Sequence, residues 1–392
     1  MTTRATGGVL MVTGAYLPEL SGGGLQCRTM IHALRDRQSF RVLTTCTDRA
    51  LEGEGDVEGV PVARVYVDPN RWRTKLAAFR RMAAWIIRHR SEFAVVHLHG
   101  FSQKSVVVVL LSRLLGKRLV LTIHTADHDE PSGARRMGRL AWWAYRQADV
   151  YVAISGRMAA NFVAAGMPRA RLLVAPNGLD LSRFAPATPA SRAAARAALG
   201  LDDGLRWILF VGFFSRDKAP DVLFDAWLRL RERHSDTGLV FIGATESDYH
   251  EVDRSIADGI RERAAVLGLS DRVRFTGPLV DVERAYHAAD VFAMPSVREA
   301  FGMVLIEAMA SGLPVVATRI EGVTDEIVDD GVTGWLVPPR DPEALSQALV
   351  RVCADPASAE AMGTRARDAV AARYGLDAAR ERWLSLYRGL AP

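Results

Sequence analysis

The chain has 392 residues, of which 49% are hydrophobic and 24% are charged. This much apolar material excludes intrinsic disorder, and because single hydrophobic cores stop growing near ~250–300 residues, we expect two domains. The apolar run 106–111 is far shorter than the ~20 residues that span a bilayer. The run 9–13 is too brief for the core of a signal peptide. We therefore expect a cytoplasmic protein.

The cysteine count and the net charge further restrict the class of protein and the partners that it can have. The three cysteines, Cys27, Cys46 and Cys353, have spacings that match neither a disulfide framework nor a zinc site. The formal net charge of +5 favours anionic partners such as nucleotide sugars, lipid phosphates or a membrane surface. Charge alone does not choose among these partners.

In the first half of the chain, short β-branched runs alternate with helix-like segments. This alternation is typical of a parallel sheet covered by helices on both faces. We predict strands at 9–13, 41–45, 95–98, 119–123, 150–154 and 172–175, and helices at 25–34, 76–90, 104–115, 138–146 and 156–165.

The composition changes at 184–191, where two prolines and several small residues suggest a linker. The alternation then restarts and indicates a second doubly wound unit. The expected strands are 207–211, 239–242, 273–275, 291–293 and 315–317, and the expected helices are 222–233, 252–267, 282–288 and 304–310. From Pro342 onward the pattern is almost wholly helical, and the last segment, 376–390, is amphipathic.

Ligands of open α/β sheets bind beyond the carboxyl ends of the strands, so motif residues should gather there. A loop ending in Gly302 brings the chain close to a ligand, and the backbone N–H groups of Met303 and Val304, at the start of the next helix, form an anion site. Glu307 lies on the same mostly apolar helix, where its carboxylate would accept two hydrogen bonds from a ribose diol. A purely structural role for Glu307 is equally consistent with these residues alone.

Glu299 and Glu307 stand eight positions apart within E-A-F-G-M-V-L-I-E-A-M-A-S-G-L-P-V-V. This stretch resembles the signature of the retaining glycosyltransferases of family 4, which have the GT-B fold. The resemblance covers nearly the whole chain and is weaker in the first half. Further matching motifs are Gly22-Gly23-Gly24, T-I-H-T at 122–125, A-P-N-G-L-D at 175–180, S-R-D-K at 215–218 and D-G-V-T-G-W-L-V-P at 330–338.

The resemblance implies roles for individual residues. Glu307 would hold the donor ribose, and Glu299 would contact hydroxyls of the transferred sugar. Lys218 and Arg216 would neutralise the leaving diphosphate, where a preorganised cation is most effective because negative charge develops there. His124, at a strand end, would lie against the donor sugar. The family often has arginine directly after the glycine that precedes this loop, and here Phe213 follows Gly212.

The remaining candidates carry weaker signals. Gly23 and Gly24 precede a helix and would bring backbone N–H groups to a phosphate or an acceptor, although a flexible loop explains them equally well. Asn177 would lie in a turn at the rim of the site, and a turn without ligand contact fits it as well.

The resemblance also implies an α/β architecture of two Rossmann-like, doubly wound domains facing across a cleft. The acceptor-side domain would comprise residues 1–185 and a returning helix, 376–392, and the nucleotide-sugar domain residues 186–375. The implied reaction is a retaining, metal-independent transfer from a nucleotide sugar to a hydroxyl of a glycan or lipid-linked acceptor, in cell-surface polysaccharide or glycolipid synthesis. We expect no cofactor and no metal.

Four alternative functions compete with this interpretation. A nicotinamide-dependent dehydrogenase needs G-x-G-x-x-G close after a strand, and neither half of the chain has it. Asp127-His128-Asp129 imitates the metal-binding triplet of the other major glycosyltransferase fold, but Lys218, Arg216 and a helix terminus already serve the phosphates. A sugar-nucleotide epimerase with the same fold and a non-catalytic sugar-nucleotide-binding relative both remain open.

Basic and aromatic residues mix in two helical segments, 71–90 and 135–146. Such faces can lie on anionic lipid, which would place the protein peripherally on the cytoplasmic face of the inner membrane. A solvated face beside core tryptophans explains the pattern equally well. Nothing at the level of the fold supports nucleic acid binding.

Overall fold

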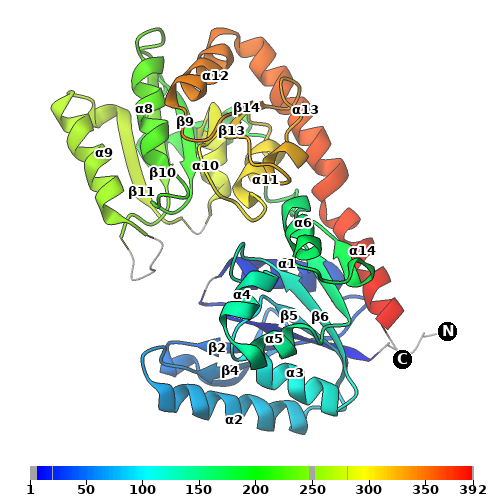
Figure 1. Ribbon diagram of the computed structural model, residues 1–392. Helices are drawn as coiled ribbons and strands as arrows, with labels where there is room; N and C mark the ends of the chain where they lie inside the picture. Colours follow the sequence, from blue (N-terminus) through cyan, green and yellow to red (C-terminus); the bar gives the residue numbers. More distant parts are fainter. Residues whose placement is uncertain (1–6, 20, 247–251, 280, 391–392) are drawn as a thin grey trace. The chain divides into compact units, whose positions relative to one another are not determined.

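The computed structural model describes residues 7–19, 21–246, 252–279 and 281–390. The chain divides into two compact units, which we call unit 1 (Met1–Gly178 and Leu376–Pro392) and unit 2 (Leu179–Gly375). Each unit is a mainly parallel sheet flanked by helices (Figure 1). Two Rossmann-like units confirm the predicted fold class.

Unit 1 contains an eight-stranded sheet in the order β3-β4-β2-β1-β5-β6-β7-β8. Its neighbouring strands pair in parallel except for the antiparallel pair β3–β4. The sequence pattern predicts neither β3, which is exposed and contains Gly53 and Gly55, nor β4, which contains Pro61. The strands are β1 (Gly8–Thr13), β2 (Phe40–Cys46), β3 (Gly53–Val57), β4 (Val60–Tyr66), β5 (Phe93–His99), β6 (Arg118–Ile123), β7 (Val150–Ala153) and β8 (Leu172–Val174).

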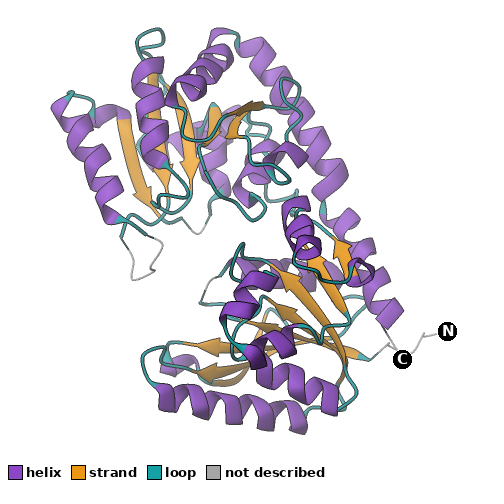
Figure 2. Cartoon of the chain, viewed as in Figure 1, coloured by secondary structure: helices purple, strands orange, loops and turns teal. Residues whose placement is uncertain are grey.

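The helices of unit 1 cover both faces of this sheet (Figure 2). The chain's last helix, α14, packs beside α1 and buries Ala379, Trp383, Leu384 and Tyr387, a spacing that forms one helical stripe. Helix α3 contacts both α2 and α5. The helices are α1 (Gly22–Leu34), α2 (Trp72–Arg88), α3 (Ser105–Leu114), α4 (Pro131–Arg136), α5 (Arg139–Tyr145), α6 (Gly156–Ala164) and α14 (Leu376–Leu390).

Unit 2 contains a six-stranded, wholly parallel sheet in the order β11-β10-β9-β12-β13-β14. Its strands are β9 (Arg206–Val211), β10 (Thr237–Ile242), β11 (Val273–Gly277), β12 (Val291–Met294), β13 (Val315–Thr318) and β14 (Trp335–Val337). Its helices are α7 (Pro189–Leu199), α8 (Pro220–Leu230), α9 (Arg254–Val266), α10 (Glu283–Ala288), α11 (Met303–Ala310), α12 (Pro342–Ala354) and α13 (Pro356–Tyr374).

The linker expected at 184–191 is only partly a linker. Helix α7 begins inside it at Pro189, and Thr188 and Ser191 form a reciprocal capping box with bonds of 3.1 and 2.9 Å. Proline suits the first turn of a helix because its missing N–H is not needed there, so this proline marks a helix start rather than a break. The division between the units lies at Gly178.

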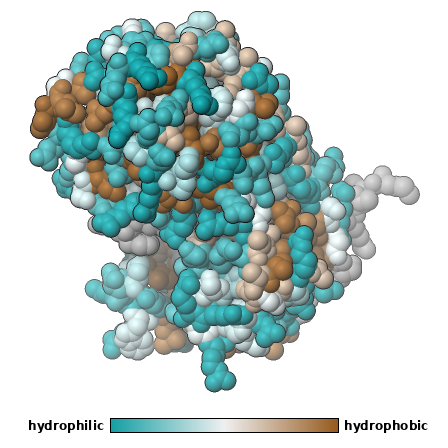
Figure 3. Space-filling view, turned by 45° about the horizontal axis from the view of Figure 1, so that its top comes forward, coloured by the Kyte–Doolittle hydropathy of each residue, from teal (hydrophilic) through white to brown (hydrophobic). Residues whose placement is uncertain are grey.

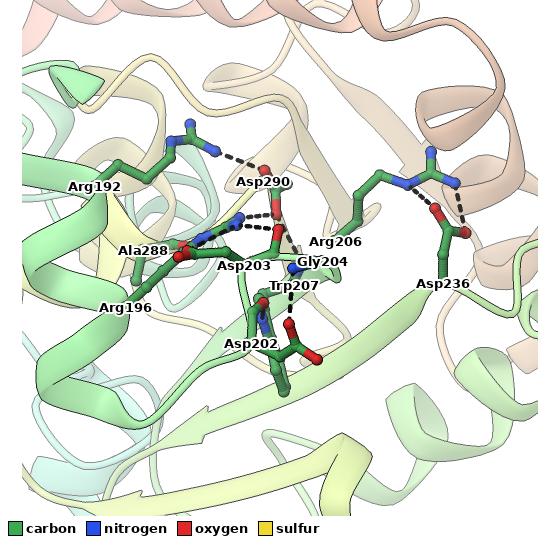
Figure 4. Close-up of polar contacts among 10 residues, drawn as sticks. All are labelled: Arg192, Arg196, Asp202, Asp203, Gly204, Arg206, Trp207, Asp236, Ala288 and Asp290. Atoms are coloured by element: carbon green, nitrogen blue, oxygen red, sulfur yellow. Dashed lines mark hydrogen bonds and ion pairs between the residues drawn. The ribbon is translucent and has the colours of Figure 1, made fainter. Parts of the chain in front are cut away.

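Asp290 anchors α7 to the sheet of unit 2 (Figure 4). Its carboxylate accepts hydrogen bonds from Arg192 (2.6 Å), from Arg196 (2.6 Å) and from the backbone N–H of Trp207 at the start of β9 (2.8 Å). The side chain of Arg196 is only 8% exposed. One carboxylate therefore compensates a buried charge and joins a helix to a strand.

The outer surface is mainly hydrophilic on the face shown in Figure 3, where hydrophobic residues form separate small patches. Within the described ranges, no helix is both long and apolar enough to cross a membrane.

We predict that Asp290→Ala lowers the free energy of unfolding of unit 2 by about 3–5 kcal/mol, because the ion pairing of the buried Arg196 is then reduced to a 3.7 Å contact with the exposed carboxylate of Asp203. Urea denaturation followed by tryptophan fluorescence measures this loss. The control Asp258→Ala removes exposed pairs with Arg254 and Arg261 on α9 and should cost less than about 1 kcal/mol. Equal losses in the two variants would contradict the anchoring role.

Candidate active site

A partly buried ion pair lies at the carboxyl edge of the unit 2 sheet. Lys218 Nζ, after β9, donates to Oε1 of Glu299, after β12, at 2.6 Å. Ser296 Oγ donates to the same oxygen at 2.9 Å, and Glu299 is only 8% exposed. The carboxylate is therefore held in one position by two donors from different loops.

Two further contacts lock those loops together. The carboxylate of Asp217 accepts from Arg298 Nη2 at 2.6 Å and from Nε at 2.9 Å, and its backbone carbonyl accepts from the N–H of Val297 at 2.7 Å. Asp217 directly precedes Lys218, and Arg298 directly precedes Glu299. The bonds between the two loops therefore fix the backbone positions from which Lys218 and Glu299 reach each other.

Helix α11 begins beside this pair, with Gly302 as its N-terminal cap residue. Gly302 has φ = 98°, a left-handed conformation that favours glycine, and as a glycine it has no side chain with which to cap the helix. The start of an uncapped helix offers backbone N–H groups and a positive dipole end to an anion. Met303 and Val304 stand in this first turn, as the sequence predicts for a phosphate site.

Glu307 lies further along α11 and is partly buried. Tyr286 Oη, from α10, donates to its Oε2 at 2.7 Å, and Oε1 has no hydrogen-bond partner among the described residues. Burial raises the pKa of Glu307 to about 7, although the bond from Tyr286 favours the carboxylate. An oxygen held in place and left without a partner suits a ligand hydroxyl.

Arg216 is not brought into this cluster. Its side chain is 88% exposed, and its Nε lies 3.6 Å from Oδ2 of Asp253. The structure thus places Lys218 and Glu299 together and leaves the guanidinium of Arg216 in solvent.

In unit 1, His124 follows β6 and lies against the start of α1. A Cβ added at Gly23 would come within 3.6 Å of Cδ2 of His124, so a glycine lets the ring approach the backbone closely. His99, at the end of β5, contacts His124 with 3.0 Å between His99 Nδ1 and His124 Nε2. Burial lowers the pKa of His124 to about 4, so the ring is neutral at pH 7.

Gly24 takes part in a helix cap, whereas Asn177 lies in the same pocket as the two histidines. Ser21 caps α1 because its Oγ accepts a hydrogen bond from the N–H of Gly24 at 3.0 Å, and a Cβ at Gly24 would stand 2.3 Å from the carbonyl oxygen of Ala15. Asn177 lines a small pocket of unit 1 together with His99 and His124.

The acidic triplet 127–129 serves the backbone. Asp129 is 3% exposed and accepts hydrogen bonds from the N–H groups of Phe101 (2.9 Å), His124 (3.1 Å) and Thr125 (2.9 Å). Its oxygens therefore organise the loops after β5 and β6. Over the described ranges, no group of three or more His, Cys, Asp or Glu side chains is arranged to hold a metal ion.

Sequence patterns alone do not single out Ser296, Tyr286 or His99. Ser296 stands three residues before Glu299, so its place in the same loop was a usable signal. Tyr286 and His99 meet their partners only through the fold, because α10 and β5 lie far from these partners in the sequence.

Two family models match the chain. The model described as Glycosyl transferases group 1 matches residues 191–369, and the one described as Glycosyltransferase Family 4 matches residues 20–183. A D-inositol 3-phosphate glycosyltransferase of Corynebacterium urealyticum is 34% identical over 378 residues, which cover 90% of this chain and 86% of the relative. A relative of the same name from Kribbella flavida is 32% identical, with 88% and 85% covered.

Solved structures show the same fold at lower identity. HepE of Anabaena in complex with UDP-glucose superposes with a TM-score of 0.79 at 20% identity, covering 98% of this chain and 100% of that one. Sucrose-phosphate synthase of Thermosynechococcus elongatus has a TM-score of 0.79 at 24% identity, with 98% and 99% covered.

The fold is that of the GT-B glycosyltransferases. The chain belongs to glycosyltransferase family 4, which confirms the resemblance seen in the sequence.

We predict that Glu307→Gln stabilises the protein at pH 8 and loses this advantage at pH 4.5. Burial raises the pKa of Glu307 from 4.5 to about 7, so the folded state keeps a proton that the unfolded state releases, and stability falls as the pH rises through this window. The free energy of unfolding that Glu307→Gln gains at pH 8, by removing the cost of ionising this carboxyl, is at most about 3 kcal/mol. Thermal unfolding at both pH values measures it, with Glu343→Gln, an exposed position, as control. An identical pH dependence in Glu307→Gln and the wild type would refute the burial of this carboxyl.

Proposed function

We propose that the carboxyl edge of unit 2 binds a nucleotide-sugar donor. In this proposal Glu307 accepts hydrogen bonds from the ribose, Glu299 contacts hydroxyls of the transferred sugar, and Lys218 neutralises the leaving diphosphate. The observation that carries the proposal is the Lys218–Glu299 pair beside the uncapped start of α11. It combines a cation, a buried acceptor and an anion-binding helix end.

The comparisons support this donor class. The HepE structures are described as complexes with UDP, with UDP and glucose, and with UDP-glucose. A UDP-sugar is therefore the first donor to test.

The names of the relatives favour a small phosphorylated acceptor. Three relatives of which this chain covers 78–86% are all named D-inositol 3-phosphate glycosyltransferase, at 32–34% identity. We therefore put an inositol phosphate hydroxyl first among the acceptors, ahead of the glycan or lipid-linked acceptor that the sequence analysis favoured.

The proposed chemistry retains the configuration of the sugar. The bond between the anomeric carbon and the leaving phosphate oxygen breaks, and the acceptor hydroxyl oxygen bonds to the same face of that carbon. The acceptor proton passes to the departing diphosphate, so no protein base is required. Negative charge builds on the diphosphate, next to Lys218 Nζ, and a positioned cation stabilises that charge.

We further propose that the reaction needs no metal ion. Lys218 and the start of α11 compensate the charge of the diphosphate, while Asp129, the buried carboxylate of the acidic triplet, is occupied by three backbone N–H groups. Activity should therefore persist in EDTA.

The direct test offers UDP-, GDP- and ADP-sugars in turn, with either D-inositol 3-phosphate or a lipid-linked glycan as acceptor, in the presence of EDTA. The anomeric configuration of the product is determined by NMR. Transfer with retention from one nucleotide class supports the proposal. Interconversion of the donor sugar without acceptor would instead indicate an epimerase.

We predict that Lys218→Ala lowers kcat by about 10²–10³-fold with little change in KM, because the cation acts mainly where charge develops in the transition state. The control Arg216→Ala removes a guanidinium that is 88% exposed and should lower kcat less than about tenfold. Steady-state kinetics with the active donor compare the two. A larger loss in Arg216→Ala than in Lys218→Ala would reverse the assignment.

A peripheral membrane location is a second proposal, and an exposed face of unit 1 favours it. Helices α2, α3 and α5 adjoin one another and present large exposed hydrophobic side chains: Trp72, Leu76 and Ile87 on α2, Leu110 and Leu114 on α3, and Leu140 and Trp143 on α5. Lys75, Arg80 and Arg88 lie on α2 and form no ion pair with a described residue. Apolar side chains among basic ones suit an anionic lipid surface.

Part of the aromatic and basic pattern has a structural use instead. Trp85 Nε1 donates to Glu54 at 3.0 Å, and the guanidinium of Arg135 lies 4.5 Å from the ring centroid of Trp142. These side chains are therefore excluded from the proposed lipid contact.

We predict that the protein sediments with phosphatidylglycerol vesicles at low salt and not with phosphatidylcholine vesicles. Trp72→Ser with Leu114→Ser should weaken this binding by about tenfold or more, because two exposed apolar side chains are lost. Val266→Ser, an 82% exposed position in unit 2, is the matched control. Equal behaviour toward both lipids would rule out this location.

A further inference from the structure

Unit 1 holds a row of three histidines that the proposed transfer only partly uses. His97 and His99 lie near the end of β5, and His124 follows β6, with ring centroids 4.4 Å and 5.1 Å apart along the row. Burial lowers the pKa of His97 to about 3 and of His124 to about 4, and that of His99 well below its usual value. All three rings are therefore neutral at pH 7, and each carries one N–H and one bare nitrogen.

His97 does not pass a hydrogen bond along the row. Its Nδ1 is 2.7 Å from the hydroxyl of Tyr387, and its Nε2 is 2.7 Å from Oγ1 of Thr122. Both nitrogens are occupied, so His97 contacts His99 through ring packing alone.

His99 and His124 share one hydrogen bond. The 3.0 Å contact joins Nδ1 of His99 to Nε2 of His124, and the ring planes differ by only 13°. With both rings neutral, one nitrogen donates and the other accepts, and two arrangements are open.

The burial of His99 selects between the two arrangements. Its Nε2 is buried and has no hydrogen-bond partner among the described residues. A proton on that nitrogen would be a buried N–H without an acceptor, which is a rare and costly arrangement in folded proteins. The proton of His99 therefore belongs on Nδ1, from which it is donated to His124.

We propose that His99 is a positioning residue that holds His124 in the tautomer protonated on Nδ1. His124 is half-buried as a residue, and its Nδ1 has no hydrogen-bond partner among the described residues. His124 then presents a hydrogen-bond donor, which binds a hydroxyl or phosphate oxygen of the ligand. It has no bare nitrogen on that side and so does not act as a base. The nature of this ligand rests on the proposed function, whereas the tautomer does not.

The tautomer is measured directly on the full-length protein. Long-range ¹H–¹⁵N spectra of protein labelled in its histidine rings separate the two neutral tautomers, and His124→Asn identifies the signals of His124. Free histidine favours the proton on Nε2. We expect His124 to carry it on Nδ1, and a proton on Nε2 of His124 would overturn the proposal.

Two variants of His99 separate a positioning role from mere packing. His99→Asn keeps an N–H close to the position of Nδ1 and should preserve both the tautomer and kcat/KM within about threefold, whereas His99→Leu should lose the tautomer and about tenfold or more in kcat/KM. His97→Asn, an equally buried ring not bonded to His124, is the control and should leave the tautomer unchanged.

Identical spectra of His124 in His99→Asn and His99→Leu would contradict the proposal. If no sugar nucleotide supports transfer, the proposed function fails, and the spectra still decide the role of His99.

Discussion

The conformation of the loops at the carboxyl edge of unit 2 depends on the groups that compensate the negative charge of Glu299. A carboxylate that is 8% exposed is unfavourable unless donors surround it, and here Lys218 and Ser296 supply them on one oxygen. These donors come from loops after different strands, so both loops must hold fixed conformations. The Asp217–Arg298 ion pair and the hydrogen bond from the Val297 N–H to Asp217 hold the two loops together. They thereby also fix the start of α11, which follows the second loop.

The two carboxyl edges are built from different chemistry. Unit 2 places charged groups there, together with a helix start that favours anions. Unit 1 places neutral imidazoles beside a glycine, with the buried Asp129 used to hold backbone N–H groups. In the proposed function, the charged groups of unit 2 would meet the diphosphate of the donor, and the neutral imidazole donor of unit 1 would meet a hydroxyl or phosphate oxygen of its ligand.

Much of the fold follows from sequence pattern, because a buried parallel strand is a continuous β-branched run and a covering helix is amphipathic. The pattern fails where local composition is misleading. Strand β3 is exposed and rich in glycine, and Pro189 begins a helix within an apparent linker. The family motif identified Glu299, Glu307 and Lys218, but it could not identify Tyr286 or His99, whose partners are distant in the sequence. Nor could it show that Arg216 is exposed to solvent.

In the proposed function, the edge around Lys218, Glu299 and Glu307 binds a nucleotide sugar. Thermal unfolding with UDP-, GDP- and ADP-sugars, each with and without EDTA, tests it most directly when the wild type is compared with Glu299→Gln. A ligand at about 100 times its dissociation constant should add about 2.7 kcal/mol of stability. We expect one nucleotide class to stabilise the wild type in EDTA, and the variant to lose most of this gain. No stabilisation by any of these sugar nucleotides, or an equal gain in the variant, would show that this edge is not the donor site.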